Sequence, residues 1–509
     1  MTYIPYLIVI ASYIIYKLLH RVQLHQRAIK LGCKPVKHIP PRNLLDRLGI
    51  YEIVHRKKLM HLGTTFEMLE EAFDRAQVKT FEGTALFSSF IMTIEPENLR
   101  HMMSLAHFNE WNIGYRPQAF GILLGDGIFS SEGTQWKHSR VMLRPSFNKE
   151  NIKQITKMEP FAARVIDLIK QKLGQAIDMQ DVFQFFTMDF TTDLLLGESS
   201  DSLKDALGQH SSTGIDPELK RQFSIAFDES SNYLMTRMIL GPLMFLVNPK
   251  TLQDAIKIQH KFVDYYIEKA LAMTSHELNE KSDDGTIFLY QLAHETKDPI
   301  NLRNQILSII LAGRNTTSGL MTFLFAQLSK NPEIYCKLRD IIRQDFPNVE
   351  SITFDSIQNC DYLRWCINET LRINPSVPFE SKTASVDTTL PRGGGVDEKA
   401  PIFIAKGTRI VYPLWVANRN EEHFGENTGE FIPERWEQLP RSGGIAFMPF
   451  SVGPRACLGQ SLALTEAAYI TIRLLQTFDS CESHLGPEPL RKTSSATMRL
   501  MDGCELSFK

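Results

Sequence analysis

The 509-residue chain lacks the features of several broad protein classes. Its seven cysteines are irregularly spaced and form no CxxC pair, so they indicate neither a zinc site nor the disulfide framework of a secreted protein. No G-x-S-x-G elbow supports a Ser-His-Asp hydrolase. A net charge of −2 gives no electrostatic argument for nucleic-acid binding. We find neither an internal repeat nor a low-complexity linker, and a hydrophobic content of 43% is enough for a large core.

An apolar run covers residues 3–19, in which only Lys17 is charged. It has the length of a membrane-spanning helix, and its tyrosines suit the membrane interfaces. The basic flank that follows favours a cytosolic position; it contains Arg21, Arg27, Lys30, Lys34 and Lys37. A cleaved signal peptide is the alternative, but no positive charge precedes the run and no A-x-A site follows it. We expect a retained anchor at 1–20 and a basic, proline-rich linker at 21–41.

The remaining residues, 42–509, have the periodicity of a mainly α domain with small β-sheets. Helices are expected at 63–76, 188–197, 222–240 and 302–330. Short strands are expected at 85–94 and around a turn within 402–415, and another hairpin at 493–498. The glycine-rich residues 388–395 are predicted to form the turn of a β-hairpin.

The most specific pattern is F-S-V-G-P-R-A-C-L-G at residues 450–459. A cysteine that binds a metal must stay deprotonated, and flanking glycines let backbone N–H groups turn toward the sulfur. A helix is expected to follow at 461–475, and its N-terminus would further stabilise negative charge. The alternative is a buried structural cysteine in a glycine-containing turn.

This segment resembles the haem-binding loop of the cytochrome P450 family, in which a cysteine thiolate ligates the haem iron. The resemblance covers nearly the whole chain after the apolar run. It implies the P450 fold, with haem b between a long central helix and the cysteine loop. It also implies that Cys457 binds the iron and that Phe450, Gly453, Arg455 and Gly459 surround the cofactor.

Trp136 and Arg140 are spaced i, i+4, so an indole N–H and a guanidinium can converge on one anion. In the P450 family this W-x-x-x-R pair contacts a haem propionate, and the resemblance implies that role here. From the residues alone, a surface cation–π pair is an equal alternative. Lys382 is a further candidate for a propionate contact.

The long apolar segment at 302–330 contains A-G-R-N-T-T at 312–317. Gly313 costs about 1 kcal/mol relative to alanine in a helix interior, which indicates a close approach or a distortion. A local bulge would free backbone carbonyls near Thr316, although a threonine that bonds its own helix is the alternative. The resemblance makes this the oxygen-binding segment, with Ala312 and Gly313 beside the haem and Thr316 assisting proton delivery. Asn315 replaces the family's usual acid, and an amide can orient water but cannot supply a proton.

Glu369 and Arg372 are spaced i, i+3 in E-T-L-R, upstream of F-I-P-E-R-W at 431–436. In the family, these two elements form a structural lock in which one glutamate bonds two arginines. The resemblance therefore implies a buried charge network, with no catalytic role.

Four segments are similar to fungal membrane-bound hydroxylases of n-alkanes and fatty acids. They are L-L-G-D-G-I-F at 123–129, W-K-H-S-R-V-M-L-R-P-S-F at 136–147, I-L-A-G-R at 310–314 and T-T-L-P-R-G-G-G at 388–395. This similarity implies a single-pass endoplasmic reticulum protein with a cytosolic catalytic domain. It would use O2 and electrons from NADPH, through NADPH-cytochrome P450 reductase, to hydroxylate the end of a long aliphatic chain.

Two alternatives stay open, because Asn315 departs from the family pattern. One is a monooxygenase of fungal secondary metabolism that oxidises a polyketide or lipid-like intermediate. The other is a haem-thiolate isomerase that needs no reductase, although Thr316 favours dioxygen chemistry.

Overall fold

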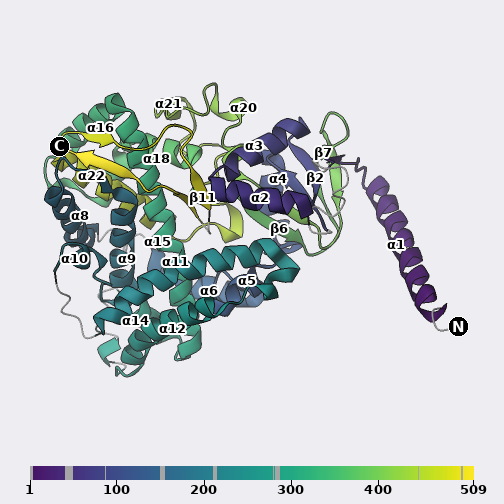
Figure 1. Ribbon diagram of the computed structural model, residues 1–509, viewed down its shortest axis with the longest axis horizontal. Helices are drawn as coiled ribbons and strands as arrows, with labels where there is room; N and C mark the ends of the chain where they lie inside the picture. The colour runs from purple at the N-terminus through teal and green to yellow at the C-terminus, as the bar shows by residue number, and fades with distance from the viewer. Residues whose placement is uncertain are drawn as a thin grey trace.

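The computed structural model describes residues 4–40, 50–85, 88–148, 155–209, 215–274, 276–278, 280, 287–444, 446–494 and 497–509. Figure 1 shows a helical body with small sheets, from which helix α1 (Ile4–Lys30) projects. Helix α1 continues past residue 20, the expected end of the anchor. Among the described residues, no helix is both long and apolar enough to span a bilayer. Beyond α1, β1 (Lys37–His38) pairs in parallel with β2 (Thr80–Ala85), so the expected linker joins a sheet.

The centre of the body is α15 (Pro299–Lys330), which confirms the helix expected at 302–330. Asp298 caps its first turn by accepting a hydrogen bond from the Ile300 amide at 2.9 Å. Apolar side chains are buried on all sides of α15, as expected for a helix that passes through a core. The helices that pack on it include α9 (Met179–Leu196), α12 (Lys250–Leu271), α18 (Asp361–Ile373) and α22 (Gln460–Thr477).

The other helices surround this core (Figure 1). The α-helices are α2 (Ile50–Leu62), α3 (Thr65–Ala76), α4 (Pro96–Met103), α5 (Arg116–Leu124), α6 (Gly133–Leu143), α8 (Glu159–Gln171), α10 (Ser202–Ala206), α11 (Pro217–Leu240), α14 (Phe288–Glu295), α16 (Pro332–Asp345), α17 (Phe354–Asn359), α19 (Leu414–Ala417), α20 (Glu421–Phe424) and α21 (Arg435–Gln438). The 3-10 turns are η1 (Phe108–Glu110), η2 (Arg144–Phe147), η3 (Ile155–Met158), η4 (Gly241–Leu246), η5 (Val349–Ser351) and η6 (Gly453–Arg455).

The strands form four small sheets within the described chain. The largest has the order β1-β2-β3-β9-β6-β4 and adds β3 (Ser88–Thr93), β9 (Arg409–Tyr412), β6 (Glu380–Ala384) and β4 (Trp111–Asn112). A second sheet joins β10 (Cys481–Ser483), β13 (Glu505–Phe508) and β5 (Ile177–Asp178). Two further pairs are β7 (Thr388–Gly394) with β8 (Ala400–Ile404), and β11 (Lys492–Ser494) with β12 (Met498–Leu500). These elements confirm the prediction of a mainly α fold with small sheets.

The prediction of a turn at 388–395 is wrong. These residues form β7, which pairs antiparallel with β8, and the turn lies at 395–399. Burial explains the difference, because Leu390 is fully buried and fixes the strand against the core in spite of the glycines that follow. The hairpin expected at 493–498 is confirmed as β11 and β12, although residues 495 and 496 lie outside the described residues.

The predicted lock around Glu369 is confirmed. The Glu369 carboxylate is fully buried and accepts hydrogen bonds from Arg372 at 2.8 and 2.9 Å and from Arg435 at 2.9 Å. The Trp436 indole and the Ile432 amide also donate to it, at 2.9 and 3.1 Å.

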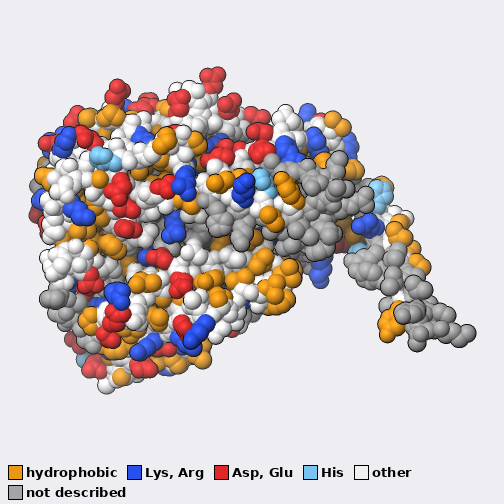
Figure 2. Space-filling model, in the orientation of Figure 1, with side chains coloured by type: hydrophobic (Ala, Val, Ile, Leu, Met, Phe, Trp, Pro, Cys, Tyr) orange, Lys and Arg blue, Asp and Glu red, His pale blue; other side chains and the backbone are white. Residues whose placement is uncertain are grey.

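Figure 2 shows acidic and basic side chains intermixed over the visible face of the body, in keeping with the small net charge.

Candidate active site

The loop that carries Cys457 is closed by its own backbone. The Cys457 amide donates to the Phe450 carbonyl at 2.9 Å, and η6 lies between the two residues. Gly453 has a φ of +73°, and a Cβ at this position would lie 1.8 Å from the Met103 carbonyl oxygen of α4. Glycine is therefore required here because the loop packs directly on α4.

The Cys457 sulfur lies at the N-terminus of α22. The backbone amides of Gly459 and Gln460 hydrogen-bond to it. The side chain is accessible, yet protein surrounds it on most sides. Burial raises the pKa of the Cys457 thiol, while the Gly459 amide, the charge of Arg140 and the Gln460 amide act in the opposite direction. A sulfur that faces two amides at a helix N-terminus fits the donor chemistry of a metal-bound thiolate.

Gly459 leaves space next to this sulfur. A Cβ at Gly459 would lie 4.0 Å from Cys457 Sγ and 3.5 Å from the Phe147 ring. These are ordinary van der Waals distances, so Gly459 differs from Gly453, where a Cβ would clash with backbone.

The structure brings Trp136, Arg140 and Arg455 together, as the sequence predicted. The guanidinium carbons of Arg455 and Arg140 lie 4.5 and 5.7 Å from the Trp136 ring centre. Arg140 donates to the Ala456 carbonyl at 2.9 Å, and Arg455 donates to the Ser131 carbonyl at 3.1 Å. Trp136 and Arg140 therefore make a cation–π contact, but Trp136 is buried, so this is not the surface pair that was the alternative; Arg455 makes a second contact of the same kind.

Arg140, Arg455 and Lys382 have no carboxylate at ion-pair distance within the part of the chain that the structure describes. Burial, followed by the charge of Arg116, lowers the pKa of Arg455 to about 10. Burial also lowers the pKa of Lys382 to about 8, and the charges of Arg116 and Arg455 act in the same direction. Partly buried cations that destabilise one another form a site for an anion, and the two carboxylates of haem fit it.

The α15 segment differs from its prediction at one point. The helix is α-helical throughout Pro299–Lys330, a range that is described without a gap, so the bulge expected near Thr316 is absent. Thr316 Oγ1 donates to the Ala312 carbonyl at 2.6 Å, and the Thr316 carbonyl accepts from Ser376 Oγ at 3.0 Å. A Cβ at Gly313 would lie 3.3 Å from Thr191 Oγ1 of α9, so close helix packing explains this glycine.

The sequence prediction missed the partner of Asn315. Asn315 Oδ1 lies 3.4 Å from Arg314 Nη1, and Arg314 is only 2% exposed. Arg314 binds Asp228 of α11 through both guanidinium nitrogens, with Nη2 to Oδ2 at 3.0 Å. A cavity of about 10 Å³, enough for one water molecule, is lined by Gln184, Asp228, Asn315 and Ser318 among others. An arginine inside an apolar helix was the sequence signal for an ion pair of a buried cation, but the position of its half-exposed partner Asp228 is set by the tertiary fold.

Comparison with known proteins agrees with this geometry. The family model described as cytochrome P450 matches residues 107–504. Cytochrome P450 52C2 of Candida maltosa is 50% identical over 506 residues, which cover 99% of both chains. Cytochrome P450 52C1 of Candida tropicalis is 45% identical, with 97% of both chains covered. Cytochrome P450 52A12 of Debaryomyces hansenii is 40% identical, with 92% of this chain and 91% of the relative covered. The chain therefore belongs to the cytochrome P450 family.

Proposed function

We propose that this P450 monooxygenase hydroxylates the terminal carbon of a long aliphatic molecule, an n-alkane or a fatty acid. The observation that carries the proposal is end-to-end similarity to cytochromes P450 52C2 and 52C1. Four segments that are similar to fungal alkane and fatty-acid hydroxylases add to it. One molecule each of substrate, O2 and NADPH, with one proton, gives one molecule each of alcohol, water and NADP+. The same relatives do not favour the secondary-metabolism alternative.

Haem b, when bound, supplies the redox chemistry that activates dioxygen. In our proposal Cys457 binds the haem iron through its thiolate. The amides of Gly459 and Gln460 stabilise the negative sulfur, and the lack of a side chain at Gly459 keeps the space beside it open. Phe450 and Gly453 hold the loop in shape, through the Phe450 carbonyl and the packing on α4.

The cations and the indole around Trp136 would bind the haem propionates. Arg455 and Lys382 are the best suited, because burial lowers the pKa of both groups even though the charges of Glu132 and Glu380 act in the opposite direction. Arg140 is also tied to the Ala456 carbonyl, so it connects the propionate region to the residue before the sulfur. Trp136 is 7% exposed and offers its face to Arg140 and Arg455.

Thr316 and Asn315 are the proposed catalytic side chains of α15, with Ala312 and Gly313 beside the cofactor. Thr316 Oγ1 would exchange its bond to the Ala312 carbonyl for a bond to water, and so hold a proton donor near the reaction. Asn315 carries no ionisable proton, so its part is to orient water, and its contact with Arg314 fixes the amide. The one-water cavity next to Asn315 is consistent with this role.

The proposal also places the protein in the endoplasmic reticulum membrane. Residues 1–20 would anchor it, residues 21–41 would link it, and residues 42–509 would form the cytosolic domain that receives electrons from NADPH-cytochrome P450 reductase. The supporting observations are that α1 projects from the body and that its last turn is basic, with Arg27 and Lys30. Alkaline extraction of microsomes tests the anchor, because an anchored chain stays in the pellet and a variant without residues 1–20 is released.

The activity is tested with microsomes that contain this chain and the reductase. They are incubated with alkanes and fatty acids of graded length, and the position of the new hydroxyl is determined by mass spectrometry. Terminal alcohols that require NADPH and reductase support the proposal. Product formed without reductase would favour an isomerase, and the absence of turnover in protein with a normal carbon monoxide difference spectrum would reject the substrate class. Cys457→Ser is the control, and we expect it to lose the spectrum and the product together.

A further inference from the structure

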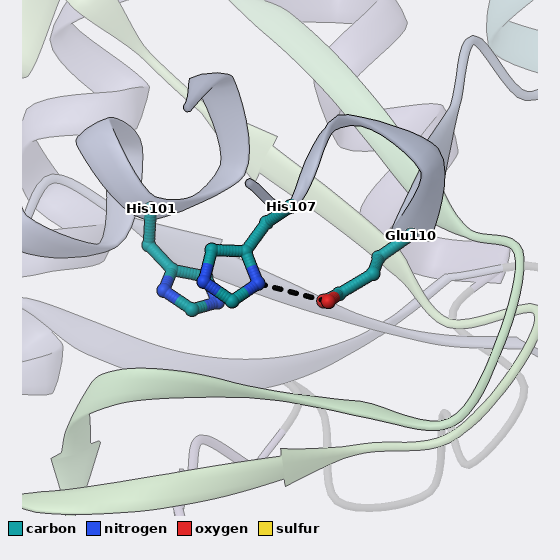
Figure 3. Close-up of side chains that lie close together, drawn as sticks. All are labelled: His101, His107 and Glu110. Carbon is teal, nitrogen blue, oxygen red and sulfur yellow. Dashed lines mark hydrogen bonds and ion pairs between the residues drawn. The ribbon is translucent and has the colours of Figure 1, made fainter. Parts of the chain in front are cut away.

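Two histidines and a glutamate lie close together outside the proposed active site. His101 is in the last turn of α4, His107 precedes η1, and Glu110 ends η1. Figure 3 shows the two imidazole rings one over the other, with the Glu110 carboxylate beside His107. One possible ligand atom from each residue lies within 4.8 Å of the other two. All three side chains are partly buried, so the cluster is neither fully solvated nor closed to a small ion.

The His101 ring has one nitrogen that could bind a metal. Its Nε2 is buried and has no hydrogen-bond partner among the described residues. The charge of the ring is also influenced by a backbone hydrogen bond with Thr389. In the tautomer that carries its proton on Nδ1, the His101 ring would present a lone pair on Nε2, as histidines do in metal sites.

Glu110 connects the cluster to the neighbouring strand. His107 Nδ1 lies 2.8 Å from Glu110 Oε1, and the Thr388 hydroxyl donates to Glu110 Oε2. The Glu110 amide also bonds the His107 carbonyl at 3.0 Å, which fixes the turn between the two residues. The carboxylate therefore has the outer hydrogen bond that metal-binding carboxylates commonly have.

We propose that His101, His107 and Glu110 bind a divalent transition-metal ion, and that Zn²⁺ is the best match. Two imidazoles and one carboxylate, with a water in the fourth position, are a known zinc donor set, whereas Mg²⁺ prefers oxygen ligands.

Only a small movement is needed to form this site. Ligand atoms about 2.0–2.1 Å from a tetrahedral zinc ion stand about 3.3 Å apart. In the structure the possible ligand atoms of the three residues lie within 4.8 Å of one another. The two imidazole rings stack with centres 3.6 Å apart and an angle of 26° between their planes. Because a ring lone pair lies in the ring plane, at least one imidazole must rotate about its Cβ–Cγ bond to face the ion. Figure 3 shows His107 already turned toward Glu110, so a rotation of His101 is the simpler route.

Metal binding here would stabilise a segment that supports the haem site. Phe108 lies between two of the ligands, and its ring centre is 5.2 Å from that of Trp136. The end of α4 carries the Met103 carbonyl that packs on Gly453. The ion would have a structural function, and its existence does not depend on the proposed substrate.

Isothermal titration of Zn²⁺ into holoprotein that carries no histidine tag and has been treated with a chelator tests this proposal. We expect one zinc site and no comparable binding of Mg²⁺. His101→Ala and Glu110→Gln should each weaken zinc binding at least tenfold, and Thr388→Val, which removes only the outer hydrogen bond, should weaken it less. The matched control is His294→Ala, at an exposed histidine of α14, and it should bind zinc as the unmodified chain does.

X-ray absorption of the zinc-loaded, unmodified protein gives a test that does not require the variants to fold. We expect scattering from imidazole nitrogen and carboxylate oxygen without sulfur. Sulfur in the zinc shell would assign the binding to cysteines such as the exposed Cys336 and overturn the proposal. Equal zinc affinity in His101→Ala and the unmodified chain, or no zinc binding, would also overturn it.

Discussion

Glu466 of α22 is a buried carboxyl group whose titration should be measurable in the stability of the protein. Its side chain is 4% exposed, and its Oε2 has no hydrogen-bond partner among the described residues. Burial alone raises the pKa of Glu466 from 4.5 to about 8. The neutral acid is therefore the form that the fold accommodates, because no positive charge among the described residues compensates the carboxylate.

The sign of the effect follows from proton binding. Between pH 4.5 and about 8 the folded chain keeps the Glu466 proton that the unfolded chain has lost, so the free energy of unfolding decreases as the pH rises. The favourable contribution is complete below pH 4.5 and is lost as the pH rises through about 8. A pKa shift of this size corresponds to a change in the free energy of unfolding of at most on the order of 5 kcal/mol. Glu466→Gln keeps the shape and removes the titration.

Urea unfolding of the holoprotein, followed by circular dichroism, measures this difference at a pH near 4.5 and at a pH above 8. Glu466→Gln should have nearly the stability of the unmodified chain at the lower pH and should be more stable by about 2 kcal/mol or more at the higher pH. Glu268→Gln, at an exposed position of α12, is the matched control and should change neither value. A stability difference for Glu466→Gln that does not depend on pH would refute the reasoning.

Four further substitutions test the site and its support. Thr316→Ala should increase the peroxide released per NADPH consumed, because the hydroxyl that holds a proton donor is lost; unchanged coupling would contradict its role. Asn315→Asp should preserve or raise the product formed per NADPH, and a loss would show that the amide has a positive function of its own. Glu369→Gln should lower the free energy of unfolding, measured by denaturant titration, by about 3–5 kcal/mol, because the buried Arg372 and the partly buried Arg435 lose their counter-charge; a much smaller decrease would contradict this account. Gly453→Ala should reduce haem content, measured by absorbance against protein, because a Cβ would lie 1.8 Å from the Met103 carbonyl; full haem content would mean that α4 can move away.

The features that were predictable from the sequence are those that depend on neighbours along the chain. The cysteine loop was recognisable from the spacing of five residues within ten positions, and the Trp136–Arg140 pair lies on one helical turn. The long apolar run of α15 requires a buried helix in any arrangement of the other elements. The Glu369 lock joins more distant residues, and it was predictable only because the P450 family provides a pattern for both parts.

The features that were missed depend on contacts between distant segments. Gly453 is explained by a carbonyl some 350 residues earlier in the chain. The ion pair of Arg314 with Asp228 joins α15 to α11. Residues 388–395 have the composition of a turn, but the burial of Leu390 makes them a strand. In each case tertiary packing decides the result, and local composition does not identify the contact that decides it.

The cations of the proposed haem site connect cofactor binding to the stability of the fold. Arg140, Arg455 and Lys382 come from α6, the cysteine loop and β6, so folding brings together three charges that are far apart in the unfolded chain. Burial is the largest cause of their lowered pKa values, and repulsion adds to it, from Arg144 on Arg140 and from Arg116 on Lys382 and Arg455, so both effects oppose this arrangement. An anion that binds the folded chain and not the unfolded chain removes this penalty and stabilises the fold by mass action. Haem would therefore act as a folding ligand through its propionates as well as through the bond to Cys457, and loss of a single cation should weaken haem retention more than it weakens the surrounding helices.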